Sequence, residues 1–149
     1  MEPALLFKIA NLIALLGWII IVALHDRPLT YRIVFNGIIL LLSVFYASAI
    51  TWSFSDPQGD GNFSSLEGVM ALFTSPKAVL AGWIHYLAFD MTVGLIIVHY
   101  GAKHGIHRLV LLPCLFFTFM FGPVGLLLFY LLLCYTQKTV LPTVFSPVS

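Results

Sequence analysis

The residues best suited to chemistry are a histidine and an aspartate in the middle of an apolar segment. His85 and Asp90 lie in the run Trp-Ile-His-Tyr-Leu-Ala-Phe-Asp at positions 83–90, inside an apolar stretch from 76 to 100. Ionisable side chains at membrane depth are energetically costly, usually face the protein interior, and mark functional sites. A carboxyl in apolar surroundings keeps its proton and can act as an acid, and a neutral histidine can act as a base.

The spacing of His85 and Asp90 places them on different sides of one helix. Five residues correspond to about 140° around the axis and about 7–8 Å along it. The two side chains therefore flank a ligand or meet partners on different helices, whereas Trp83 and Asp90, seven residues apart, share a face. The alternative is a structural role, in which both residues hydrogen-bond to neighbouring helices. Asn11 and Thr118 are among the available partners.

The composition indicates a protein that lies in a lipid bilayer. The chain has 149 residues, of which 60% are hydrophobic and 9% are charged, against about 25% charged in soluble domains. A chain this apolar cannot cover itself with polar surface. Its net charge of +1 excludes nucleic-acid binding, which needs clustered lysine and arginine. We expect residues 1–149 to form a single membrane domain.

Four apolar segments are long enough to cross a membrane as helices. They cover about residues 5–24, 33–53, 76–100 and 109–135, and each reaches the roughly 20 residues that a crossing requires. Their apolar character is continuous rather than alternating, which favours helices over a β-barrel. The sequence therefore predicts an all-α fold, a four-transmembrane-helix bundle, in a multi-pass integral membrane protein.

The connection between the second and third segments predicts a short additional helix. Residues 53–62 are rich in turn formers, and the apolar piece that follows, 64–73, is too short to cross. A re-entrant or interfacial helix fits this length. Ser64 and Glu67 match a capping box, with Ser64 as the N-cap and Glu67 at the third helical position. If this helix enters the membrane, Glu67 becomes a further candidate acid.

The fourth segment contains two prolines and predicts a bend. Pro113 lies near its start, and Gly122 precedes Pro123 in its middle. Proline removes a helix hydrogen bond and kinks or breaks the helix. A bend near Pro123 would open space beside a group of aromatic residues and suit a long apolar ligand. The alternative is an ordinary kinked helix. The aromatic residues are Phe116, Phe117, Phe119 and Phe121.

Several motifs together resemble the abscisic-acid-deficient-four family of small four-span membrane proteins, which is linked to neoxanthin synthesis in plants. The motifs are Ser-Leu-Glu-Gly-Val at 65–69, Gly-Trp-Ile-His-Tyr-Leu-Ala-Phe-Asp at 82–90 and Leu-Pro-Cys-Leu at 112–115. Thr-Phe-Met-Phe-Gly-Pro-Val-Gly-Leu-Leu at 118–127, and Phe-Lys-Ile-Ala-Asn at 7–11 with Trp18, are also similar. The resemblance covers essentially the whole chain.

The resemblance implies an isomerisation of a carotenoid epoxide, which needs no redox cofactor. Plant members are associated with converting violaxanthin to neoxanthin, a reaction that opens an epoxide and removes a proton to leave an allene. We expect Asp90 or Glu67 to be the acid and His85 to be the base, with no metal and no cofactor. The candidate substrate-binding residues are Asn11, Trp83, Phe89, Thr118 and Phe121.

Two other functions remain open. The first is a non-catalytic protein that binds a carotenoid or another isoprenoid, in which the polar residues only orient the end rings. The second is a haem or quinone protein with His85 and His99 as ligands. These histidines are 14 residues apart, about 21 Å on one helix, so they cannot ligate one haem together.

The expected partners and location follow from the same observations. Membrane lipid and a carotenoid or another long isoprenoid are the expected partners, nucleic acid is not, and a homo-oligomer is left open. No transit segment is visible. We therefore expect a bacterial relative in the inner membrane, or a protein of the plastid membrane.

Overall fold

The computed structural model describes residues 2–55, 61–142 and 144, so residues 56–60 of the polar connection lie outside the described chain. Every regular element in the described part is a helix, as the sequence predicts. In chain order they are α1 (Pro3–Leu24), α2 (Pro28–Ile33), the π-helix η1 (Val34–Ile39), α3 (Leu40–Ser53), α4 (Leu66–Leu72), α5 (Pro76–Lys103), α6 (Arg108–Phe121) and α7 (Pro123–Gln137).

Three of the helices are long and apolar enough to cross a membrane. They are α1 with 22 residues, the continuous helix Pro28–Ser53 with 26, and α5 with 28. Each opens with a proline in its first turn, where the missing N–H would have no helical partner anyway. The first three predicted spans therefore coincide with helices that could cross a membrane, and the second of these helices begins at Pro28 rather than near residue 33.

The prediction of a fourth span is wrong. The apolar segment is divided into α6, with 14 residues, and α7, with 15, about 21 and 22 Å long against a hydrocarbon core of about 30 Å. Gly122 ends α6 with φ +45° and ψ −94°, and Pro123 has no N–H to continue the helix. The bend expected near Pro123 is a complete break in the helix.

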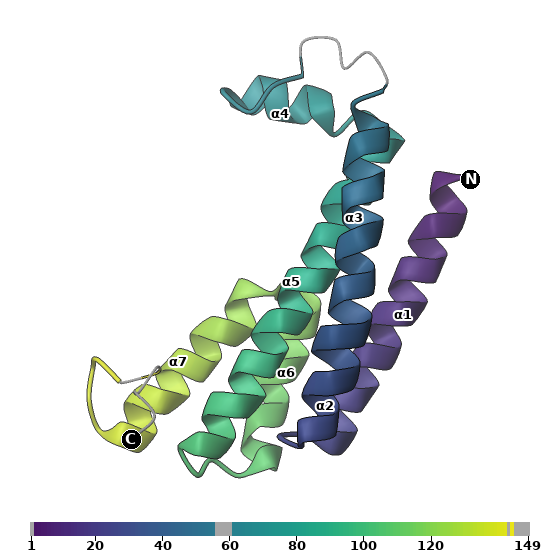
Figure 1. Ribbon diagram of the computed structural model, residues 1–149. Helices are drawn as coiled ribbons and strands as arrows, with labels where there is room; N and C mark the ends of the chain where they lie inside the picture. Colours follow the sequence, from purple (N-terminus) through teal and green to yellow (C-terminus); the bar gives the residue numbers. More distant parts are fainter. Residues whose placement is uncertain (1, 56–60, 143, 145–149) are drawn as a thin grey trace.

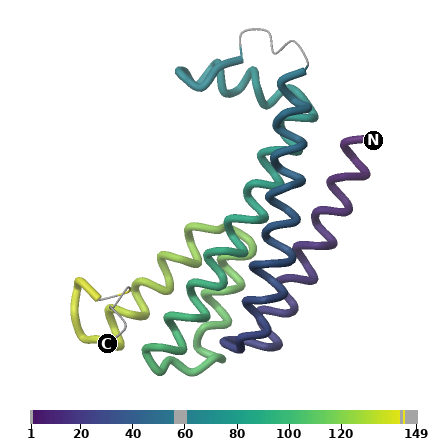
Figure 2. The backbone as a smooth tube through the Cα atoms, viewed as in Figure 1, coloured from purple at the N-terminus to yellow at the C-terminus, as the bar shows by residue number. Residues whose placement is uncertain are grey.

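Helices α6 and α7 form a tight hairpin. A Cβ on Gly125 would lie 2.2 Å from the backbone nitrogen of Thr118 and 2.4 Å from the carbonyl oxygen of Cys114, so α7 packs back along α6 with no room for a side chain there. At the far end of α7, Nε2 of Gln137 lies 3.5 Å from Nδ1 of His104, just beyond α5. Figure 2 shows both helices running from the break toward the same end of the bundle.

Helix α5 is the central element. Of its apolar window 56% is buried, against 28% for α1 and 22% for Pro28–Ser53, and α1, α3 and α6 all pack against it. Figure 1 shows α3 and α1 beside it and the α6–α7 hairpin along its second half. The approach of α1 is close: a Cβ on Gly94 would lie 2.8 Å from the Trp18 ring. A side chain on α5 therefore faces a different neighbour on each side of the helix.

A short helix lies between α3 and α5, as the sequence predicts, but its cap differs. Ser65, not Ser64, is the N-cap of α4, and its hydroxyl accepts a hydrogen bond from the Gly68 amide at 3.0 Å. Glu67 is therefore the second helical residue rather than the third, and the predicted capping box is wrong by one residue. Figure 1 shows α4 at the top of the molecule, crosswise to α3 and extending away from α1. Its re-entrant or interfacial placement stays a prediction.

The close contact at Gly125 predicts a large loss of stability when it is replaced. In Gly125→Ala the added methyl meets backbone atoms that cannot move aside, so we expect the upper end of the usual overpacking penalty, about 3 kcal/mol. Gly37→Ala is the matched control, because a Cβ there meets nothing within 4 Å. Denaturant unfolding of the detergent-solubilised protein measures both. Equal stability of the two variants would contradict the tight hairpin.

Candidate functional site

The strongest candidate for chemistry is Asp90, which is buried where the hairpin meets α5. It lies near the middle of α5 and is 8% exposed. A Cβ on Gly122 would lie 2.5 Å from Oδ1 of Asp90 and 3.3 Å from Oδ2, so the carboxyl group lies against the break between α6 and α7. Its Oδ2 is buried without a hydrogen-bond partner in the described chain. A buried carboxyl oxygen without a partner is a costly feature that a purely structural residue would not need.

Two helix ends of opposite polarity meet at this carboxyl. Helix α7 begins at Pro123, and the Gly125 amide is already bonded to the Gly122 carbonyl at 3.1 Å. The amino end of a helix carries partial positive charge and the carboxyl end of α6 partial negative charge. The amino end of α7 favours the charged carboxylate of Asp90, and the carboxyl end of α6 favours the protonated form, which can donate a hydrogen bond. The break can therefore support Asp90 in both of the states that a proton-transfer group must adopt.

Tyr86 completes this part of the site. Its hydroxyl donates to the backbone carbonyl of Met120 at 3.1 Å, and it also interacts with the carboxyl group of Asp90, one turn further along α5. Tyr86 was not among the candidate residues predicted from the sequence. The available signal was its spacing of four residues from Asp90, which brings two side chains together on a helix.

Asn11 and Trp83 are brought together across α1 and α5. Nε1 of Trp83 donates to Oδ1 of Asn11 at 3.2 Å, and the Trp83 ring lies 5.5 Å from the Tyr86 ring. Trp83, Tyr86 and Asp90 thus follow one side of α5, and we call these three residues the polar strip. The strip turns from α1 at Trp83 toward the α6–α7 break at Asp90.

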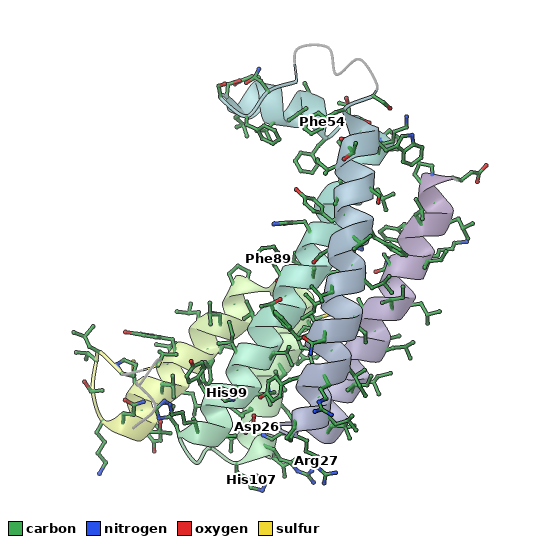
Figure 3. The ribbon with its side chains drawn as sticks, in the orientation of Figure 1. Asp26, Arg27, Phe54, Phe89, His99 and His107 are labelled. Carbon is green, nitrogen blue, oxygen red and sulfur yellow. The ribbon has the colours of Figure 1, made fainter. Side chains whose placement is uncertain are left out.

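His85 lies on another side of α5. Its exposed ring is 5.5 Å from the ring of Tyr46 in α3 and 4.5 Å from the ring of Phe89. It lines a cavity of about 160 Å³ between α3, α4 and α5, whereas Asp90 faces the α6–α7 break. Phe89 is 61% exposed and points away from the bundle in Figure 3. The structure does not bring His85 and Asp90 together.

The other predicted site residues lie in three different settings. Glu67 is exposed in the first turn of α4. Thr118 is completely buried, and its hydroxyl donates to the Cys114 carbonyl at 2.8 Å inside the hairpin. Phe121 is the last residue of α6, 56% exposed, and directly precedes Gly122. Of the three, Phe121 lies near the Asp90 carboxyl, because this carboxyl packs against Gly122, the next residue in the chain.

An apolar groove of about 490 Å³ lies between α1 and α6. Of the four phenylalanines beside which a space was expected, Phe116 and Phe119 line this groove and the other two do not, and α1 forms its other wall. The ring of Trp18 meets that of Phe119 edge-on at 5.6 Å at one end of the groove. Phe119 directly precedes Met120, whose carbonyl binds Tyr86, so this end adjoins the polar strip. The lining residues are Leu15, Trp18, Ile19, Val22, Ala23, Leu112, Leu115, Phe116 and Phe119.

The two histidines considered as haem ligands lie on one unbroken helix. His85 and His99 both belong to α5, which keeps them about 21 Å apart. His99 instead lies with Nδ1 at 3.4 Å from Oδ1 of Asp26. In the described residues, no three or more histidine, cysteine, aspartate or glutamate side chains are grouped to hold a metal ion.

Comparison with known proteins identifies the family. A family model described as ABA DEFICIENT 4-like matches residues 5–129, which is most of the chain. This match includes all of α1 to α6 except the first two residues of α1, together with the first part of α7. No curated protein and no solved structure gives a match.

The setting of Asp90 predicts that replacing this residue will not lower the stability of the protein, even if it lowers activity. Asp90→Asn keeps the shape and adds an amide donor beside the carbonyl end of α6, so we expect unchanged stability or a gain of about 0.5–2 kcal/mol, as is common when a strained functional residue is replaced. Denaturant unfolding in detergent measures it. A loss of more than about 1 kcal/mol would instead indicate a structural carboxylate.

Proposed function

We propose that this chain, which belongs to the ABA DEFICIENT 4-like family, acts on a carotenoid within the membrane by proton transfer from Asp90. The family match and three helices long and apolar enough to cross a membrane support this setting, and the location, substrate and reaction are our proposal. The observation that carries it is the buried Asp90 oxygen without a partner, next to the end of an apolar groove. An apolar groove suits the long hydrocarbon part of a carotenoid, and the polar strip beside its end suits one of the two polar end rings.

The groove and the polar strip supply complementary parts of such a site. The lining runs along α1 from Ala23 to Leu15, and Asn11 continues the same side of α1 one turn further on. From Ala23 to Asn11 is about 18 Å, which is long enough to hold much of a polyene. An end ring held beside Tyr86 on the polar strip would lie one turn of α5, about 6 Å, from Asp90.

The proposed reaction is an epoxide isomerisation of the kind that the family resemblance implies. Asp90 donates its proton to the epoxide oxygen as the C–O bond breaks, and a proton leaves the neighbouring carbon as the allene forms. The carboxylate that remains on Asp90 is the nearest base in the described site, so it can accept this second proton. The two transfers balance, and no redox cofactor is needed. Tyr86 lies one turn of α5 from this carboxyl and holds the end of α6 in place through its bond to the Met120 carbonyl.

This arrangement assigns different roles to the two predicted ionisable residues. His85 as the base stays a prediction, because it lies about 140° around α5 from Asp90 and contacts Tyr46 and Phe89 instead. A substrate in the α1–α6 groove approaches the side of α5 that carries the polar strip. A variant that lacks His85 therefore separates a one-carboxyl mechanism from an acid–base pair.

Pigment chromatography tests the proposed chemistry. In a violaxanthin-producing bacterial strain we expect the natural chain to generate an isomeric pigment, and Asp90→Asn to reduce its formation at least about a hundredfold, which is the usual contribution of a general acid. Asp26→Asn is the matched control, because Asp26 lies at the far end of the bundle beside His99. If pigment co-purifies unchanged with the natural chain, the protein is a carotenoid binder instead.

Filling the groove tests where the pigment lies. Ile19 lines the groove and is 55% exposed, whereas Val44 of α3 is 62% exposed and does not line it. We expect Ile19→Trp to lower the amount of co-purifying pigment several-fold, because the indole occupies the groove, and the matched control Val44→Trp to leave it unchanged. Absorbance spectra of the purified variants measure this. Equal loss in both variants would place the pigment elsewhere.

A further inference from the structure

The α6–α7 hairpin determines which charges share one end of the molecule. We define the lower end as the one that carries the α1–α2 and α5–α6 connections, drawn at the bottom of Figure 1. The contact of Gln137 with His104 places the end of α7 there too. A fourth crossing would have carried this part of the chain to the opposite end. Lys138, which directly follows α7, therefore belongs to the lower end.

The cations of the chain are distributed unequally as a result. The chain has seven lysine and arginine residues, all within the described part. Only Lys8 and Lys77 lie toward the upper end, in α1 and at the start of α5. A chain with four crossings would have a nearly even distribution of four against three, whereas the hairpin makes it five against two. The lower-end cations are Arg27, Arg32, Lys103, Arg108 and Lys138.

Other titratable groups at the lower end reduce this positive charge only slightly. Asp26 is the one acidic residue there among the described residues, and it is held by the Tyr31 hydroxyl and by His99. Partial burial lowers the pKa of His25, against an opposing effect of Asp26, so His25 is largely neutral at pH 7. Figure 3 shows Asp26, Arg27, His99 and His107 gathered at this end. The described acids of the upper end are Glu2 and Glu67.

We propose that the lower end is a contact surface for anionic phospholipid headgroups and faces the cytoplasmic leaflet of a bacterial inner membrane. Lysine and arginine in short connections set the orientation of membrane proteins, with the cations on the cytoplasmic side, and anionic lipids of that leaflet attract them. In this arrangement three helices cross the membrane, and α6 and α7 enter it from the lower side and return there. Both α4 and the start of α1 lie on the opposite side. This inference does not depend on the proposed chemistry.

Cysteine labelling tests the orientation. In a full-length chain with Cys114→Ala and Cys134→Ala, single variants Lys8→Cys, Arg108→Cys and Lys138→Cys are expressed in a bacterial inner membrane and exposed to a membrane-impermeant maleimide from the periplasmic side. We expect Lys8→Cys to react, and the other two to react only after the membrane is opened with detergent. Reaction of Lys138→Cys together with Lys8→Cys would overturn the hairpin topology. Reaction of Arg108→Cys and Lys138→Cys without Lys8→Cys would show the opposite orientation and overturn the proposal.

Reconstitution tests the headgroup contact. The natural chain is placed in phosphatidylcholine vesicles with and without phosphatidylglycerol, and its thermal unfolding midpoint is measured. We expect phosphatidylglycerol to raise the midpoint, and this rise to shrink at high salt because ions screen surface charges. Arg27→Gln with Arg108→Gln should lose more than half of the rise, while the matched control Lys8→Gln with Lys77→Gln keeps it. An equal rise in both double variants would overturn the proposal.

Discussion

The interruption of a helix inside an apolar environment is the constraint on which this structure depends. A helix end leaves backbone groups without partners, and no water is available in hydrocarbon to bind them. The break at Gly122 places two such ends at one point, beside the middle of α5. Tyr86 satisfies one carbonyl of α6, and the carboxyl of Asp90 fits against the glycine that has no side chain. The break therefore accounts for the polar side chains at this depth, because they fit against it and bond the backbone groups that it leaves without helical partners.

The sequence predicts the long helices well because length and apolar content determine them. It could not predict the hairpin, because hydropathy continues unchanged through Gly122 and Pro123, and the tight packing at Gly125 depends on a contact with Thr118 that no local pattern contains. Asp90 was found because a carboxyl is rare in such a segment. Tyr86 was not singled out, because a tyrosine is not rare in such a segment. His85 was recognised as unusual, but only the packing of α5 shows that it faces α3.

The site is also arranged for rigidity where position matters. Gly94 brings Trp18 against α5, and Trp18 in turn meets Phe119 of α6. These contacts fix the distance between α1, α5 and α6 just below the polar strip. The bond between Asn11 and Trp83 joins α1 and α5 just above it. A side chain on α5 between these two contacts has little freedom to shift, which is what the proposed proton transfer from Asp90 would require.

The groove between α1 and α6 is lined by side chains that are about half exposed, among them Ile19 and Phe116. It therefore opens on the side of the bundle, where acyl chains would lie if the three long helices cross a membrane. The ligand of the proposed function would then reach the groove by diffusing in the plane of the membrane. Its occupancy would depend on the number of ligand molecules per lipid, so the composition of the bilayer would regulate it.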